Sequence, residues 1–591
     1  MVALLVGIVL DVAAGVVSRY VFNASFRWTE ELGFVMFVWL IFFGITRAHR
    51  RRQHIAVDVV ARSAPAALRP AFEFGANFIV AYTTCVMIFS AWDAATLIGG
   101  VLPALGWPTE VRYLPLCATA ALGLACLLLR EIESGGAVLN MVAAIAFGVA
   151  VFVATGVLDL VRIPALAPTQ VMLGAFSVGV LLGAPVGYVL LFSAYLATWG
   201  ADLLPAAAVA QNMINGASKF ILLAIPLFLL AGYLMNAGGL TTRLYDLAFA
   251  LVGHWRGGFA QVNVVNSVLV GGVSGSSSAD AAMDTKMLVP QMVRHGYTAS
   301  FSCAITAASA ILPNIIPPSI AMLIYASIAQ VSILKLFLAG YLTGLVLAGT
   351  LMVCVYVISV RRGYGHDRRW IGRSGLARAV RAAIPVLVMP LLIVGGIRFG
   401  ITTATEAGGI AVVYALGLGF WLREFRPGDL LANLRDAAGD AALIGFLLAV
   451  TAPFGYVMIS ERLPQQVVQW VVSLTTDPLV LLLLINLVLL FAGMFLDLAV
   501  SILILVPLTV PVVTQMGVDP IHYAIIVIVN LMIGGITPPV GQLVFVTSSI
   551  ARVPATEVFR ASMPFLAALL VGLALITVFP GISLFLPRLL G

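Results

Sequence analysis

The sequence predicts an all-α polytopic membrane protein with about 16 membrane helices. Of its 591 residues, 62% are hydrophobic and only 10% are charged, and the mean hydropathy is +1.09. Soluble globular domains carry about 25% charged residues, so this composition excludes them. The apolar residues form continuous runs, and a run of about 20 is long enough to cross a bilayer as a helix.

Four apolar runs predict a four-helix membrane domain over residues 1–134. The predicted helices cover residues 1–22, 29–46, 72–100 and 112–129. A basic cluster follows the second helix: Arg47, Arg50, Arg51 and Arg52. Because cytoplasmic loops are enriched in Lys and Arg, we expect this cluster and the N-terminus in the cytoplasm. The net charge of +7 comes from arginines in such short loops and not from one basic soluble face, so we expect no nucleic-acid partner.

Residues 135–168 are predicted to be one further membrane helix and a linker. An apolar helix over 138–161 precedes a proline-rich segment at 162–168. The remainder, 169–591, is predicted to be a second, larger membrane domain. It is divided into two inverted repeats and one basic cytoplasmic loop: about 169–360, about 382–591, and the loop 361–381.

Residues 271–285, GGVSGSSSADAAMDT, interrupt an apolar run where a membrane helix should continue. They hold four Ser, one Thr, three Gly and two Asp. Irregular polar backbone at membrane depth is tolerated only where it is buried in protein or lines a polar cavity. We therefore predict a binding site here.

Two Pro-Pro pairs indicate an internal repeat. They are Pro317–Pro318 in NIIPPSI and Pro538–Pro539 in GGITPPVGQ, and each precedes an apolar run that ends in Ser-Ile-Ala. Weakly similar halves with corresponding Gly/Pro-broken segments are typical of the substrate and ion sites of secondary transporters.

The stretch SRYVFNASFRWTEELGFVMFVWLIFFGITRAHRRRQHIAVDVV resembles the small permease subunit of TRAP (tripartite ATP-independent periplasmic) transporters. Residues 221–282, which begin ILLAIPLFLLAGYLMN, are similar to the large subunit, as are NIIPPSI, FLDLAVSILILVPLTVPVV and GGITPPVGQ, in the family's order. One departure is MDTK at 283–286, where small neutral residues are expected.

This resemblance implies a fused small and large permease of the bacterial inner membrane, with an elevator-type transporter fold and two re-entrant hairpins. Residues 1–134 would then be the small-subunit domain, 135–168 the fusion helix and linker, and 169–591 the transport domain. The resemblance also implies sodium-coupled uptake of a small organic acid, such as a C4-dicarboxylate, a sugar acid or a similar carboxylate. A periplasmic substrate-binding protein would hand over this substrate. Besides that protein, the expected partners are the carboxylate, sodium ions and the lipid bilayer. We expect no catalytic residue, no cofactor and no metal other than the coupling sodium.

By the same resemblance, each repeat holds one sodium ion at its helix break, where freed carbonyls and hydroxyls supply oxygen ligands. The candidates for the first site are Ser274, Gly275, Ser276, Ser277 and Asn314. The candidates for the second site are Gly493, Asp497, Ser501, Gly535 and Thr537. The candidates for the substrate site are Ser278, Asp280, Pro317, Pro318, Pro538 and Pro539.

Several acidic residues stand in apolar surroundings. A charge at the centre of a membrane helix costs about 2.5–3.5 kcal/mol, so Asp280 and Asp497 are by default candidate functional residues. Asp280 could equally cap its helix or pair with Lys286. Glu406 either lines the substrate pathway or has a structural role. The two glutamates of WTEE serve either as interfacial anchors or in subunit docking.

Other classes of protein fit the sequence less well. The G-x-S-G pattern at 272–275 fits an intramembrane serine protease, but the six histidines lie near basic residues or span ends, away from that serine. Neither HExxH nor a Walker lysine motif is present, which argues against a zinc enzyme and an ATP-driven pump. A stand-alone sodium–carboxylate symporter would have similar repeats but would lack the N-terminal four-helix unit.

Overall fold

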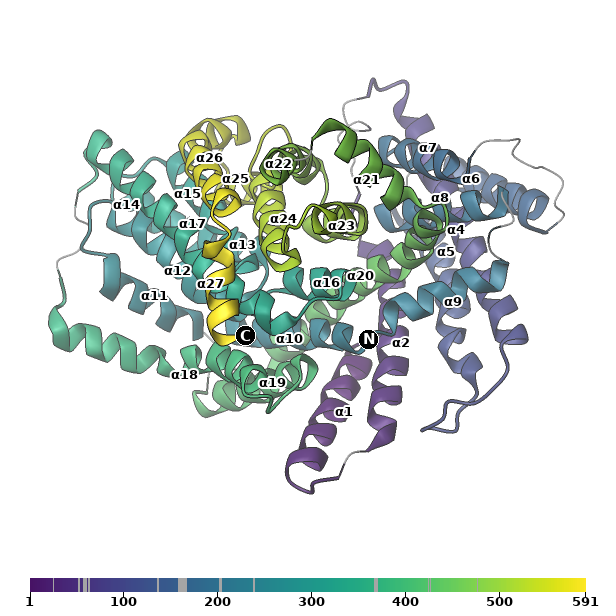
Figure 1. The fold of residues 1–591 in the computed structure, drawn as a ribbon, viewed down its shortest axis with the longest axis horizontal. Helices are drawn as coiled ribbons and strands as arrows, with labels where there is room; N and C mark the ends of the chain where they lie inside the picture. Colours follow the sequence, from purple (N-terminus) through teal and green to yellow (C-terminus); the bar gives the residue numbers. More distant parts are fainter. Residues whose placement is uncertain are drawn as a thin grey trace. The chain divides into compact units, whose positions relative to one another are not determined.

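The computed structural model is helical along the chain (Figure 1). It describes residues 1–24, 26–51, 54–56, 61, 64–134, 138–157, 167–200, 203, 205–237, 240–365, 370–423, 425, 427–475 and 477–591. Within these ranges the only extended pairings are two isolated β-bridges, Ala56 with Pro185 and Val101 with Pro108.

Eleven helices in the described ranges are long and apolar enough to cross a membrane, or up to 12 with one bent pair counted as a span. That pair, Ala206–Ala217 and Phe220–Asn236, is bent by 59°. The predicted all-α polytopic membrane fold is therefore confirmed. The figure of about 16 spans stays a prediction, because the other apolar helices are shorter.

The chain forms two compact units. The first unit contains Met1–Pro226 and Arg435–Gln469, and the second contains Leu227–Leu434 and Trp470–Gly591. These units cut across the predicted sequence domains, whose boundaries stay predictions. Of the predicted fusion segment, residues 135–137 and 158–166 lie outside the described residues.

The first unit is built around α4, which packs on α5, α6, α8 and α9. Its helices are α1 (Val2–Tyr20), α2 (Arg27–Arg51), α4 (Arg69–Leu97), η1 (Thr109–Arg112), α5 (Leu114–Ser134), α6 (Val138–Phe152), the π turn η2 (Val153–Val157), α7 (Pro168–Leu181), α8 (Val186–Gly200), α9 (Ala206–Ala217) and η3 (Phe220–Leu223). Three helices have residues in both units: α10 (Ala224–Ala237), α20 (Pro427–Ser460) and α21 (Leu463–Leu474).

The four predicted N-terminal helices are present with shifted ends. The second, α2, continues to Arg51, so part of the basic cluster is helical and the prediction of a loop directly after residue 46 was wrong. The predicted fusion helix, α6, lies along α4: a Cβ at Gly148 would be 3.0 Å from the Ala81 Cβ, and Tyr82 Oη lies 3.1 Å from Thr155 Oγ1.

The C-terminal part of α20 packs tightly on α2 within the first unit. A Cβ at Gly445 would lie 2.5 Å from Ile41 Cγ1. Further along this contact, the Arg47 guanidinium donates to Asp436 Oδ1 at 2.9 Å. Small residues let helix backbones approach closely in membranes, where lipid is as apolar as the helix surface. Thus α20, a helix of the predicted transport domain, packs closely on α2 of the predicted small-subunit domain.

We expect Gly445→Leu to lower the melting temperature of the full chain in detergent, because the added side chain must displace Ile41. Overpacking of this kind costs about 1–3 kcal/mol. Gly455→Leu is the matched control on the same helix, since a Cβ there meets no atom within 4 Å. Equal melting temperatures for the two variants would show that the α2–α20 contact is loose.

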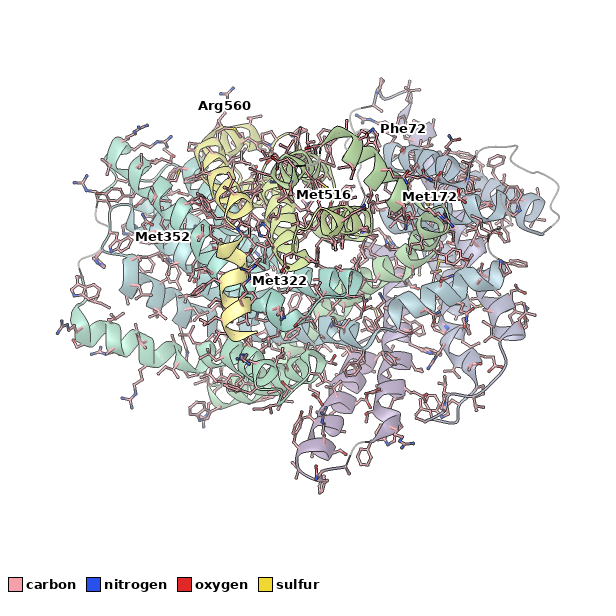
Figure 2. The ribbon with its side chains drawn as sticks, viewed as in Figure 1. Phe72, Met172, Met322, Met352, Met516 and Arg560 are labelled. Atoms are coloured by element: carbon pink, nitrogen blue, oxygen red, sulfur yellow. The ribbon has the colours of Figure 1, made fainter. Side chains whose placement is uncertain are left out.

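The second unit contains part of each predicted repeat: residues 227–360 of the first, and 382–434 and 470–591 of the second. Its helices are α11 (Leu240–Val252), α12 (Gly258–Ser274), α13 (Ser277–Met287), α14 (Val289–Arg294), α15 (Ala299–Ser309), η4 (Leu312–Asn314), α16 (Ile320–Ala329), α17 (Ile333–Arg362), α18 (Gly372–Arg398), α19 (Ala404–Trp421), α22 (Pro478–Phe495), α23 (Leu498–Gln515), α24 (Pro520–Gly534), α25 (Gln542–Ala551), α26 (Ala555–Val578) and α27 (Gly581–Leu590). Met322 of α16, labelled in Figure 2, touches α17, where a Cβ at Gly340 would lie 2.6 Å from Met322 Cε.

The helices of the second unit recur at constant spacing. α13 begins at Ser277 and α23 at Leu498, α15 begins at Ala299 and α24 at Pro520, and the offset along the chain is the same for both pairs. The two Pro-Pro motifs are separated by this same offset, and both of their Pro-Pro peptide bonds are cis. The short helices that follow, α16 and α25, both have 10 residues and end at left-handed residues, Gln330 and Arg552. The repeat seen in the motifs therefore extends through the surrounding helices, while its inverted orientation stays a prediction.

Candidate functional site

The first helix break lies at Gly275 and Ser276. Gly275 ends α12 in the left-handed conformation (φ 60°, ψ 13°), Ser276 is extended (φ −129°, ψ 105°), and α13 begins at Ser277. Asn266 of α12 donates from Nδ2 to Asp284 Oδ1 of α13 at 3.0 Å, and the two residues are equally far from Gly275 in sequence. The chain therefore folds back on itself at the predicted polar stretch.

This break lies against the first Pro-Pro pair. A Cβ at Gly275 would be 3.1 Å from the Pro318 carbonyl oxygen, and one at Gly272 would be 3.5 Å from that of Pro317. Glycine thus allows two backbone segments that are separated in sequence by α13, α14 and α15 to approach closely. The predicted neighbourhood of the polar stretch and the Pro-Pro motif is present in the structure.

The side chains predicted for the first sodium site differ in exposure. Ser277 is 4% exposed, and its Oγ has no hydrogen-bond partner. Asn314 is also buried, and its Nδ2 lies 3.2 Å from the Sδ of Met532 in the second repeat. Ser278, a predicted substrate residue, is exposed, and the side chain of Ser274 lies outside the described residues.

The second helix break lies between α22 and α23. Asp497 is the N-cap of α23, and its Oδ1 accepts a hydrogen bond from the Ala499 N–H at 2.9 Å. One turn further on, Ser501 is completely buried, and its Oγ has no hydrogen-bond partner. A capped carboxylate and a buried hydroxyl thus stand one turn apart at the start of α23.

The other candidates for the second sodium site lie where α22 meets α24. A Cβ at Gly493 would be 2.7 Å from the Leu531 carbonyl oxygen, so these two helices touch through their backbones. The Gly535 carbonyl accepts from Leu543 N–H at 3.0 Å, and Thr537 Oγ1 donates to a backbone carbonyl at 2.8 Å. The second Pro-Pro pair that follows is half-buried at its first residue and exposed at its second.

The two breaks carry the same pair of functional groups in exchanged positions. In the first repeat the N-cap is Ser276 and Asp280 follows one turn later; in the second the N-cap is Asp497 and Ser501 follows. The backbone hydrogen bonds between the paired positions are 3.1 Å and 2.9 Å long. Asp280 and Ser501 are 1% and 0% exposed. Each repeat therefore offers one carboxylate and one hydroxyl at its break.

Two of the acidic candidates have structural roles. Glu406 forms a capping box with Thr403 at the start of α19, since each side chain accepts from the other's backbone N–H. Glu31 Oε2 accepts from the N–H groups of Ala104 and Leu105 at 2.9 and 3.0 Å, which ties a loop of the first unit to α2. Both carboxylates satisfy backbone donors, as the structural interpretation of Glu406 expects.

Sequence inspection missed a polar face of α12. Asn263 Nδ2 donates to Thr306 Oγ1 at 2.7 Å, and Asn266 donates to Asp284. The signal was present in NVVNS, because residues three apart lie on one helix face. Among the described residues no group of three or more His, Cys, Asp or Glu is placed to hold a metal. The individual sodium and substrate assignments stay predictions.

A polytopic helical protein with corresponding helix breaks in two repeats has the organisation of a secondary transporter. Residues 173–582 match the family described as "Tripartite ATP-independent periplasmic transporter, DctM component", and residues 8–134 match the corresponding DctQ component. The chain belongs to the TRAP transporter permeases and carries both membrane components in one polypeptide. The resemblance found in the motifs is thereby confirmed.

Curated relatives agree with this assignment. The chain is 32% identical to the isethionate TRAP transporter permease protein DctMQ of Oleidesulfovibrio alaskensis, over 95% of this chain and 89% of that one. It is also 32% identical to the sialic acid TRAP transporter permease protein SiaT of Haemophilus influenzae, over 98% and 96%. The C4-dicarboxylate TRAP transporter large permease protein DctM of Pseudomonas aeruginosa is 39% identical over 65% of this chain and 90% of its own. These relatives are permeases and not enzymes, so the protease alternative is not supported.

Proposed function

We propose that this permease takes up a small organic acid by sodium coupling, after a periplasmic substrate-binding protein has delivered it. The observation that carries the proposal is the carboxylate and hydroxyl pair at each helix break, Ser276 with Asp280 and Asp497 with Ser501. Unwound backbone carbonyls and the C-terminal ends of half-helices are the usual sodium ligands of repeat-built secondary transporters. One sodium ion at each break is expected.

An organic acid fits the electrostatics of the breaks. The N-termini of α13 and α23 carry partial positive charge, which favours an anion, and a bound sodium ion adds to it. The three relatives are named for isethionate, sialic acid and C4-dicarboxylate, and all three are organic acids. A C4-dicarboxylate, a sugar acid or a similar carboxylate is therefore the proposed substrate class.

The proposed movement is elevator-like, with the Pro-Pro segments and helix breaks carrying substrate and sodium together across the bacterial inner membrane. The N-terminal helices would brace the static part. The tight packing of α2 on the C-terminal part of α20 supports that bracing role, because it joins the two predicted domains through backbone-close contact. The arginines at the end of α2 favour a cytoplasmic N-terminus.

Uptake of a labelled organic acid into proteoliposomes tests this proposal. With the cognate binding protein outside and an inward sodium gradient, we expect accumulation that disappears when choline replaces sodium. Omission of the binding protein should abolish uptake as well. Uptake without sodium would overturn the coupling, and sodium-driven uptake without the binding protein would favour a stand-alone symporter.

A further inference from the structure

A buried polar pair on α12 and α13 is not part of either helix break. Asn266 and Asp284 are each 2% exposed, and they are joined by the 3.0 Å hydrogen bond from Asn266 Nδ2. Among the described residues no Lys, Arg or His forms an ion pair with Asp284. Burying an ionisable side chain inside a membrane protein costs free energy, so such a residue is by default a candidate functional residue.

One oxygen atom of this pair is left without a hydrogen bond. Asn266 Oδ1 is buried and has no hydrogen-bond partner. It shares an amide group with the Nδ2 that contacts Asp284, so it lies close to the same carboxylate. A buried acceptor left unsatisfied is destabilising. A bound cation would satisfy this oxygen and compensate the carboxylate at the same time.

A second carboxylate stands one helical turn away. Asp280 and Asp284 are four residues apart, so they are neighbours on one face of α13, with Cβ atoms about 5–6 Å apart. Both belong to the buried face of the helix, whereas Ser278 and Lys286 are exposed. The buried face of α13 therefore gathers two carboxylates next to the orphaned amide oxygen of α12.

We propose that Asp280, Asp284 and Asn266 bind a further sodium ion, in addition to the one at each helix break. The choice of sodium rests on the proposed function, whereas the site itself rests on the contacts above. The donors are all oxygens, which suit a hard cation.

The second repeat has no counterpart of this site. At the offset that relates the two Pro-Pro motifs, Leu487 and Leu505 take the places of Asn266 and Asp284. Asp284 also lies in the MDTK segment, which departs from the small neutral residues expected there. The further site is therefore an addition to the first repeat and does not belong to the duplicated pattern.

Equilibrium binding of radioactive sodium to the full chain in lipid nanodiscs tests the proposal. We expect the Asp284→Asn variant to bind one sodium ion fewer per chain than the wild type. Asp429→Asn is the matched control, because it removes the same charge at an exposed position of the second unit and should leave the number unchanged.

A second variant tests whether misfolding, and not loss of the site, lowers the number of bound sodium ions. Asn266→Leu combined with Asp284→Leu gives the first repeat the residues of the second, and replacing a buried polar pair by apolar side chains is often neutral or stabilising. It should also bind one sodium ion fewer and elute as a single species. An unchanged sodium count in both variants would overturn the site, including the case in which the pair holds a proton. If no sodium ion binds at the helix breaks, a different result is expected: the Asp497→Asn variant would then bind as many sodium ions per chain as the wild type.

Discussion

Asp497→Asn is expected to lower the apparent sodium affinity for uptake by about tenfold or more, equivalent to about 1.4 kcal/mol or more. Asparagine is as good an N-cap as aspartate, so the hydrogen bond to Ala499 N–H can be kept while the negative charge is lost. The effect therefore reports on the charge alone. Uptake in proteoliposomes at graded sodium concentrations measures it.

Asp477→Asn is the matched control. Asp477 caps α22 in the same way, with its Oδ1 accepting from Leu479 N–H at 2.8 Å, but it is exposed and lies at the opposite end of α22 from the break. Its replacement should leave the sodium dependence unchanged. If both variants behave like the wild type, Asp497 caps a helix and binds no ion.

Gly275→Ala is expected to abolish most uptake while the chain still folds. The left-handed conformation costs a non-glycine residue about 1–2 kcal/mol, and the new methyl group would also lie 3.1 Å from the Pro318 carbonyl oxygen. The helix break and the Pro-Pro segment must then move apart, which alters the position of every candidate ligand at the first site. Uptake rate and melting temperature measured on the same preparation separate transport from stability.

Gly363→Ala provides the comparison for this variant. Gly363 follows the last residue of α17 in the same left-handed conformation (φ 71°), but a Cβ there meets no atom within 4 Å. Both variants therefore carry the same backbone penalty, and only Gly275→Ala disturbs a second segment. Similar losses of uptake in the two would mean that the close approach to Pro318 is not needed.

Patterns that are local in sequence predicted much of the fold. Continuous apolar runs predicted the helices, and the hydroxyl-rich stretch after Val270 predicted the break at Gly275, since glycine and serine there cannot continue a lipid-facing helix. The Thr403-x-x-Glu406 spacing is a capping-box signature, so the structural role of Glu406 could have been assigned from sequence.

Contacts that depend on register across the fold were not predictable in this way. The Asn266–Asp284 pair exists because the turn at Gly275 sets two helices in a particular register, and a longer turn would separate them. The packing of Gly445 on Ile41 joins α20 to α2, which lie in different halves of the sequence. Nothing in either local sequence specifies that partner.

The exchange of groups between the two breaks has a consequence for how the halves work together. A carboxylate at an N-cap is held by backbone N–H groups, as Asp497 is, whereas Asp280 projects from the first turn of an already formed helix. The negative charge thus lies at the N-cap in one half and one turn inside the helix in the other. The two breaks therefore differ in where their charge lies, and the sodium ions proposed for them need not bind or leave at the same point of the transport cycle.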